Sequence, residues 1–385
     1  MQDSASEHTF LTDSFELPPQ QTRLQQFWTQ LRKNRLALVG FVIFLVFFVI
    51  ALTGRLLTFG TSPLLDPSMV RLQEKLRPPL SRPNMESLLP EEIPPMGVYL
   101  LGTDELGRDV FARMLQGAWV SLSVGFVAVG IAVFIGILLG GLAGYYGQNP
   151  VRVGEVLIAV LVIWLALGWG KLSALILVVL ALAAIAIAAV LVVQRDSDSR
   201  GLLHVFSAHF LSVDMVITGL IDIMLCFPSF FLILTVVALL PASIYNIMIV
   251  IGITSWMGAA RFVRAEFLSL REQDFVDAAR ALGVPDWRII FRHMVPNAIA
   301  PVLVSATIGI AGAILTEAGL SFLGFGVPPP DATWGNILSD GKNYLFDAPW
   351  LTFVPGIAIL VVVLSFNLFG EGLRDILNPK LRERH

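Results

Sequence analysis

Few polar residues in this sequence lie at spacings that support catalysis or nucleotide binding. A phosphate-binding loop needs a glycine-rich turn followed in series by Lys and Ser or Thr. The pairs Gly170-Lys171 and Gly341-Lys342 lack the rest of that pattern. The histidines form no paired helical metal motif, since they are scattered at His8, His204, His209, His293 and His385. We therefore expect no catalytic residue, no metal site and no cofactor bound by this chain.

Three polar residues, Asp222, Glu317 and Asn367, stand within long apolar runs. Charged groups at membrane depth are costly, so they should face the interior of a helix bundle and find partners there. One interpretation is that they line a solute pathway, where a carboxylate would contact an amino group. The other is a structural pair or hydrogen-bonded cluster near a helix end. The second is favoured, because Asp222 and Glu317 each lie within a few residues of a predicted span boundary.

The composition indicates the elements that must carry these residues. Apolar residues make up 56% of the chain and charged residues 14%. Apolar runs of about 20 residues recur, which is long enough to cross a bilayer as a helix. The sequence therefore predicts an all-α polytopic protein of the lipid bilayer. The single cysteine, Cys226, excludes an internal disulfide, and the net charge of −3 argues against nucleic acid as a partner.

The N-terminal part predicts a tail, a span and a long outer loop. Residues 1–35 are polar and open with no basic segment typical of a cleaved signal peptide. Basic residues at its end, Arg32, Lys33 and Arg35, predict a cytoplasmic tail before a first span at 36–53. Residues 54–117 are rich in proline and form the predicted extracytoplasmic loop, because loops of this length cross the membrane regardless of their charge.

A polar, basic island at residues 271–301 separates two long apolar runs. Phe275, Ala278, Ala279 and Leu282 recur at helical spacing and predict a helix over 274–282. Gly283 and the following Pro285 are typical helix-stop residues. A second apolar set, consisting of Trp287, Ile290, Phe291 and Met294, predicts another short helix before Pro296. Periodicity alone also allows an amphipathic helix lying on the lipid surface.

This island resembles the signature loop of ABC importer permeases. The resemblance rests on Asp277-Ala278-Ala279, on Gly283 and on the ending Val295-Pro296. Two positions depart from the family pattern, because Asp277 replaces the usual Glu and His293 the usual apolar residue. The resemblance implies a coupling helix that docks into a groove of a separate ATPase subunit. Phe275 and Leu282 are then the candidate apolar anchors, and Asp277 and Arg280 the candidate polar contacts.

Three other segments resemble the dipeptide, oligopeptide and nickel branch of these permeases. They are residues 101–110 with the GTDxxGRDV pattern, residues 315–326 and residues 366–375. In the first, Asp104, Arg108 and Asp109 predict a local ion-pair cluster, interpreted as a structural clasp that packs the loop onto the spans. Including the island, the resemblance covers about residues 25–148 and 212–383, and it does not distinguish one substrate from another.

The remaining spans predict a six-helix type I permease core with an added hairpin. After a glycine-rich span at 118–147, two apolar stretches at 153–169 and 172–193 depart from the family and predict an inserted transmembrane hairpin, 153–193. The core domain, 214–370, contains the arginine-rich loop 266–297 and is followed by a basic tail, 371–385. About eight spans result, with both termini cytoplasmic. A tilted span plus a re-entrant segment is the alternative to the hairpin, but it would reverse the later topology against the loop charges.

The resemblance implies the pore-forming permease subunit of an ATP-driven importer in a bacterial inner membrane. It also implies four kinds of partner: a second permease, two ATPase subunits, an external solute-binding protein and the bilayer. ATP hydrolysis would occur in the ATPases, so the chain itself would not be an enzyme. Peptides are the expected solute, with nickel chelates and glutathione-like solutes as alternatives. An ion-coupled carrier and a non-transporting scaffold are the competing functions.

Overall fold

The computed structural model describes residues 23–60, 63–147, 149–151 and 211–377. Within them, five helices are long and apolar enough to cross a membrane, and a bent helix pair provides a sixth candidate span. The six-helix core expected from the sequence is therefore present in the described residues. The inserted hairpin predicted at 153–193, the first 22 residues and the end of the tail lie outside them.

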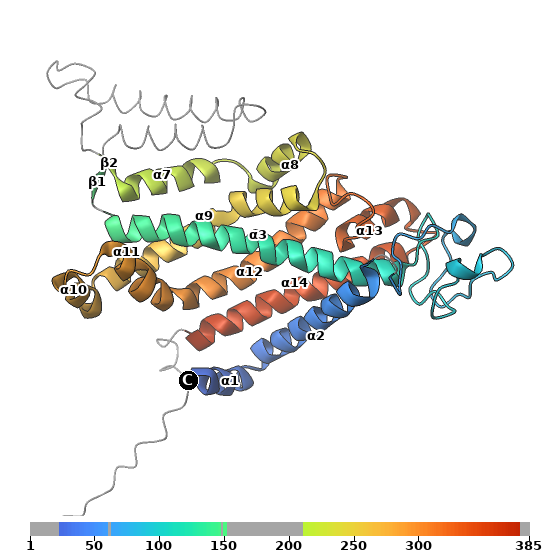
Figure 1. The fold of residues 1–385 in the computed structure, drawn as a ribbon, viewed down its shortest axis with the longest axis horizontal. Coiled ribbons are helices and arrows are strands. Elements are labelled where there is room, and N and C mark those ends of the chain that lie inside the picture. The colour runs from blue at the N-terminus through green and yellow to red at the C-terminus, as the bar shows by residue number, and fades with distance from the viewer. Residues whose placement is uncertain (1–22, 61–62, 148, 152–210, 378–385) are drawn as a thin grey trace, which may run out of the picture.

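The chain passes back and forth through one helical bundle (Figure 1). The candidate spans are α2 (Arg35–Thr58), α3 (Val110–Tyr146), the pair α7 (Val213–Leu225) and α8 (Ser229–Leu239), α9 (Ile244–Arg271), α12 (Val295–Phe322) and α14 (Trp350–Leu377). Shorter helices are α1 (Arg23–Lys33), α10 (Asp274–Ala281), α11 (Asp286–Arg288) and α13 (Trp334–Gly341). Single 3-10 turns occur at Leu72–Glu74, Pro90–Glu92 and Lys342–Tyr344.

Two helices are longer than their apolar runs indicate. α3 begins at Val110, inside the stretch 54–117 that the sequence assigns to the outer loop. Its start is set by Asp109, whose carboxylate accepts a hydrogen bond of 2.8 Å from the backbone N–H of Phe111. α9 continues to Arg271, inside the stretch 266–297 that the sequence assigns to the arginine-rich loop. Both extensions mix charged or polar residues with apolar ones, so an apolar run alone does not mark them as part of a span.

The candidate span that contains Asp222 is broken into two helices. α7 and α8 meet at an angle of 81° across residues 226–228. Pro228 precedes the first residue of α8, and a proline has no backbone N–H to continue the helical ladder. The break leaves α7 beside α9 and turns α8 away from the axis of α7 (Figure 1).

The centre of the bundle is the pair α3 and α9, which run side by side in close contact. Gly136, Gly140 and Gly144 of α3 face Ala259, Ala260 and Phe267 of α9, and a side chain at any of these glycines would overlap atoms of α9. Small residues permit such close approach of helices in lipid, where van der Waals contact drives association. The tight packing expected from the glycine-rich sequence of this span is therefore directed at α9.

A two-residue strand pair closes the gap before α7. β1 (Pro150–Val151) and β2 (Leu211–Ser212) are antiparallel, with Val151 opposite Leu211. The end of α3 and the start of α7 therefore lie at the same end of the bundle (Figure 1).

Different loops and short helices lie at the two ends of the bundle (Figure 1). The long loop that follows α2 and the helix α13 lie at one end. At the other end lie α1, α10, α11 and the C-terminal end of α14. The helical corner formed by α10 and α11 is thus separated from the long loop by the full length of the spans.

Candidate functional site

Helix α10 divides its apolar residues between two faces. Val276 and Ala279 are buried against Phe267, Ile289 and Met294. Phe275 and Leu282 instead are 38% and 82% exposed, and Ala278 is exposed beside them. The sequence placed Phe275, Ala278, Ala279 and Leu282 on one face, and this is wrong for Ala279. The helix therefore attaches to its own chain through one face and presents a second apolar face outward.

The helix ends in a Schellman motif at Gly283. The N–H of Val284 donates to the carbonyl of Ala279 at 3.1 Å, and the N–H of Gly283 donates to Arg280 at 2.9 Å. Gly283 has φ +70°, in the left-handed region that favours glycine. A β-carbon at this position would meet no atom within 4 Å. Only the backbone conformation therefore requires glycine here, as the stop pattern in the sequence predicts.

The second element of the corner is not a separate helix. From Asp286 the chain runs as one continuous helical segment to Phe322, through a π-helical stretch at Ile289–Met294. The separate short helix predicted before Pro296 is therefore wrong. Pro296 follows this stretch, and the wider turn admits a residue that cannot donate to the preceding ladder. Ile290 and Met294 are buried, while Trp287 and Phe291 are exposed.

A polar contact that the sequence did not reveal holds the corner to α3. Asp286 accepts hydrogen bonds from the hydroxyls of Tyr145 at 2.7 Å and Tyr146 at 3.1 Å. The guanidinium of Arg280 lies 5.1 Å from the centre of the Tyr145 ring, a cation–π distance. Arg280 also lies 3.4 Å from Asp277, and both side chains are exposed there. The end of α3 is thus in contact with the corner twice, through Asp286 and through Arg280.

The three polar residues of the apolar runs have different surroundings. Glu317 is fully buried and accepts a hydrogen bond of 2.6 Å from Ser321, which lies 3.5 Å from Thr333 at the start of α13. Asn367 is half-buried in α14. Asp222 is not directed inward as expected, because it is exposed on α7 and pairs with Arg261 of α9 at 2.8 Å. The inward placement holds for Glu317 and is wrong for Asp222.

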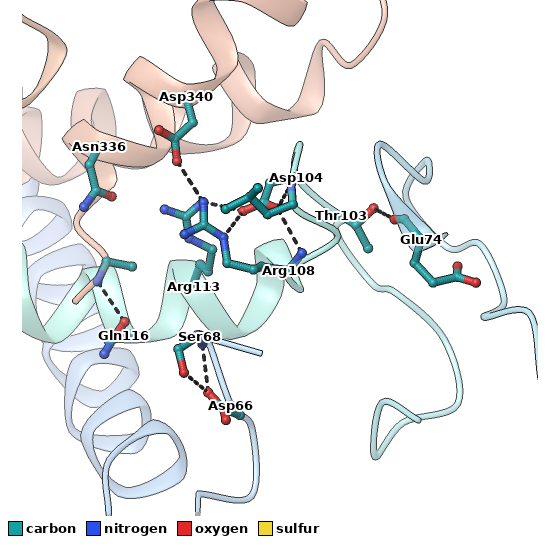
Figure 2. Close-up of polar contacts among 12 residues, drawn as sticks. Asp66, Ser68, Glu74, Thr103, Asp104, Arg108, Arg113, Gln116, Asn336 and Asp340 are labelled. Carbon is teal, nitrogen blue, oxygen red and sulfur yellow. Dashed lines mark hydrogen bonds and ion pairs between the residues drawn. The ribbon is translucent and has the colours of Figure 1, made fainter. Parts of the chain in front are cut away.

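The acids and bases of the long loop after α2 form a buried ion-pair cluster (Figure 2). The carboxylate of Asp104 has no exposed surface and lies 2.6 Å from both Arg108 and Arg113. The same two arginines contact Asp340 of α13, at 3.3 and 3.0 Å. The charges of two acids and two bases therefore cancel within one site. The sequence indicated Asp104 and Arg108, whereas Arg113 and Asp340 are brought in by the fold.

Backbone contacts add to this clasp. Leu106 and Arg108 donate their N–H groups to the second oxygen of Asp104, both at 2.9 Å. Trp350 of α14 donates to the carbonyl of Thr103 at 3.2 Å. Asp109 lies beside the cluster as the cap of α3, and burial raises the pKa of its carboxyl above the usual value. The cluster and these contacts join the loop to α3, α13 and α14 at one end of the bundle.

Comparison with known proteins agrees with the segments singled out above. Residues 202–383 match the family described as "Binding-protein-dependent transport system inner membrane component", and residues 22–79 match the "N-terminal TM domain of oligopeptide transport permease C". The dipeptide transport system permease protein DppC of Alkalihalophilus pseudofirmus is 36% identical over 92% of this chain and 88% of its own. The corresponding protein of Haemophilus influenzae is 31% identical over 94% and 96%.

Two further matches are more distant. The glutathione transport system permease protein GsiD of Pectobacterium atrosepticum is 31% identical over 75% of each chain. Among solved structures, an inward-facing MetNI methionine ABC transporter chain matches with a TM-score of 0.40 and 14% identity, over 69% of this chain and 96% of that one. From the sequence relatives, the chain belongs to the family of binding-protein-dependent transport system inner membrane components, the transmembrane permease subunits of ABC importers, in which separate ATPase subunits hydrolyse ATP.

Proposed function

We propose that this permease forms half of the solute pathway of a peptide importer, together with a second permease, two ATPase subunits and an external binding protein. Peptides are supported by the relatives, which include dipeptide and oligopeptide permeases. Glutathione, itself a peptide-like solute, is the alternative supported by the glutathione permease among them. ATP drives alternating access, so neither an ion-coupled carrier nor a scaffold is retained.

In this proposal the end of the bundle that carries α10 lies in the cytoplasm, together with both termini. Support comes from the distribution of charge. Short cytoplasmic loops of membrane proteins carry an excess of Lys and Arg. The bases at this end include Arg32, Lys33, Arg271, Arg280, Arg288, Arg292 and Arg374. At the other end the long loop contains acids and bases in paired contacts.

Helix α10 is then the element that contacts an ATPase subunit. The observation that supports this most directly is its second apolar face, where Phe275 of the helix is 38% exposed and Leu282, the residue that caps the helix, is 82% exposed. An amphipathic helix recognised in a groove uses anchors of this kind. The polar residues Asp277 and Arg280 flank the face and supply the contacts that orient it.

α10 packs directly against residues of the spans, so a displacement of α10 is passed on to them. Its buried residues Val276 and Ala279 pack in one cluster with Phe267 of α9 and Met294 at the start of α12. Phe267 in turn contacts Gly141 and Gly144 of α3. The helix therefore moves with three spans rather than with its own loop alone. Transport follows only if the ATPase binds α10 with different free energy in its two nucleotide states.

The test replaces Gly283 in the complete transporter, reconstituted in lipid vesicles with the binding protein. Gly283→Val should greatly reduce peptide uptake per ATP hydrolysed, because a β-branched residue strains the left-handed conformation by on the order of 1–2 kcal/mol and displaces Leu282. Gly283→Asn is the matched control, since Asn tolerates that conformation and the site has space for a side chain. Wild-type uptake per ATP in the Val variant would contradict the proposed role of α10.

A further inference from the structure

One exposed face of α9 differs from the exposed faces of the other spans. On this side of α9, Phe262 is a large apolar residue that is 57% exposed. Five other outward residues recur at intervals of three and four and are small or polar, with one charge among them: Ser255, Gly258, Arg261, Ala265 and Ser269. We call these five residues the α9 stripe. At Gly258 a β-carbon would meet no atom within 4 Å, so the surface in front of the stripe is open in this chain.

The contrast with α2 and α14 indicates what surrounds each face. α2 exposes branched apolar residues such as Val39, Val42 and Val46. α14 does the same with Phe353, Ile357 and Leu360. Such surfaces suit hydrocarbon. The mean hydropathy of the best window is 1.4 for α9 but 3.0 for α2 and 2.3 for α14. α9 is therefore less apolar as a whole than α2 or α14, and its stripe suits lipid less well than their exposed faces do.

Counted from the first residue of α9, the ion pair on this stripe falls near the α10 end of a hydrocarbon core and not beyond it. Arg261 comes 17 residues after Ile244, so at about 1.5 Å per residue it stands roughly 25 Å along the helix, inside a hydrocarbon core of about 30 Å. Its guanidinium contacts Asp222 at 2.8 Å, yet the two side chains are 57% and 68% exposed. Charged groups this exposed are not stable against hydrocarbon, which leaves water or a polar partner as their surroundings.

A second ion pair between the same two helices has the geometry expected of a purely structural contact. Asp214 of α7 and Arg264 of α9 form a two-pronged contact, with one hydrogen bond at 2.6 Å. These side chains are only 26% and 30% exposed, and the contact lies close to the start of α7. This pair fastens α7 to α9. The Asp222–Arg261 pair makes a single contact and presents its remaining oxygen and N–H groups outward.

We infer that the face formed by Asp222 and the α9 stripe lines the solute pathway, and that Asp222 and Arg261 are the groups that contact the charged termini of a peptide. The inference rests on the proposed peptide transport and adds to it the residues that meet the solute. A peptide carries an ammonium and a carboxylate, which are complementary to Asp222 and Arg261. In the resting chain the two side chains neutralise each other.

A paired acid and base suit such a pathway because each can exchange the other for a charged group of the peptide. Leaving a charge unpaired in a poorly hydrated site is strongly unfavourable. When a zwitterion enters, Asp222 takes its ammonium and Arg261 its carboxylate, so no charge is left without a partner. When the solute leaves, the pair forms again. Neither side chain has to lose its counter-charge at any stage.

The test compares charge-altered variants in the complete transporter with its binding protein, using alanylalanine as the probe. Asp222→Asn and Arg261→Gln should each lower uptake per ATP by 10-fold or more. The exchanged variant, Asp222→Arg with Arg261→Asp, restores a pair between the helices but reverses the direction of the charges, and uptake should stay low. Recovery of uptake in the exchanged variant would show that the pair is only structural, and the inference would be wrong.

A second measurement uses Cys226, the single cysteine of the chain, which is exposed four residues after Asp222. A membrane-impermeant cationic thiol reagent should modify Cys226 in reconstituted vesicles, as read by mass spectrometry, and saturating alanylalanine should slow the modification at least threefold. A thiol covered by lipid or by the second permease would not react, which would overturn the inference. Asp214→Asn is the control, since loss of a fastening pair should reduce the yield of assembled transporter but not uptake per ATP.

These results separate the two proposals. If the wild-type transporter takes up alanylalanine but the Asp222 and Arg261 variants match it, only the pathway assignment fails. If the wild-type transporter does not take up peptides at all, the proposed function itself fails.

Discussion

Tyr145, the penultimate residue of α3, donates a hydrogen bond of 2.7 Å to the carboxylate of Asp286, the first residue of α11. The contact joins a span to the corner that carries α10. Arg280 of α10 lies over the ring of the same tyrosine at 5.1 Å. One aromatic side chain is therefore in contact with both elements of the corner, at the point where movement of α10 would pass to α3.

Removing the hydroxyl of this tyrosine should loosen the corner. Tyr145→Phe keeps the ring but deletes a hydrogen bond to a charged acceptor, a contact worth about 1.5–3 kcal/mol. We expect lower uptake per ATP with ATPase activity retained, measured in the complete transporter. Tyr146→Phe is the matched control, because its bond to Asp286 is longer at 3.1 Å and exposed. Equal effects of the two variants would show that the Tyr145 contact has no special role.

The clasp should be sensitive to loss of one charge. Asp104→Asn would leave Arg108 and Arg113 with Asp340 as their common acid, and breaking a buried pair in this way costs about 3–5 kcal/mol. The purified chain should unfold at a lower temperature, and protease should cut the loop at 63–109 earlier. Asp66→Asn is the comparison, since Asp66 accepts hydrogen bonds from the exposed Ser68. Unchanged proteolysis of the Asp104 variant would argue against a clasp.

The contact between α3 and α9 should tolerate no added side chain. In Gly140→Val the new β-carbon would overlap the backbone of Ala260, and overpacking typically costs about 1–3 kcal/mol or more. We expect little folded protein in the membrane fraction. At Gly130 on the same helix a β-carbon would meet nothing within 4 Å, so Gly130→Val should fold. Similar yields of the two variants would contradict the packing described.

Tyr99 should make the outer loop sensitive to alkali. The side chain is fully buried and its hydroxyl has no hydrogen-bond partner among the described residues. Burial raises its pKa to about 12 from the ordinary value of 10.0. Because the unfolded chain loses this proton first, stability is fully present below pH 10 and is lost as pH rises toward 12.

Replacement of this residue provides the check. Tyr99→Phe should be neutral or slightly stabilising at pH 7, because it removes a buried polar group that has no partner. It should also lessen the loss of stability between pH 10 and 12. The loss of stability is measured as the rate at which a protease cuts the loop, at a series of pH values, in the wild-type protein and in Tyr99→Phe. Identical alkaline profiles would show that Tyr99 does not titrate in a folded loop.

Much of this protein can be predicted from local pattern. The apolar runs indicate the spans, since the length needed to cross a bilayer is a property of the chain itself. The stop at Gly283 and the break at Pro228 follow from backbone restrictions of single residues. The pairing of Asp104 with Arg108 is also local, because the two residues are four apart.

Other features were decided only by the tertiary structure. In the sequence, Asp222 and Glu317 are both acids within apolar runs. In the structure, Asp222 is exposed beside Arg261, whereas Glu317 is buried with Ser321. The contacts of Asp286 with Tyr145 and of Arg113 with Asp340 join residues 141 and 227 positions apart. Hydropathy and periodicity describe one helix at a time. Which face of a span meets lipid, water or another helix depends on how the helices pack, and no single segment contains that information.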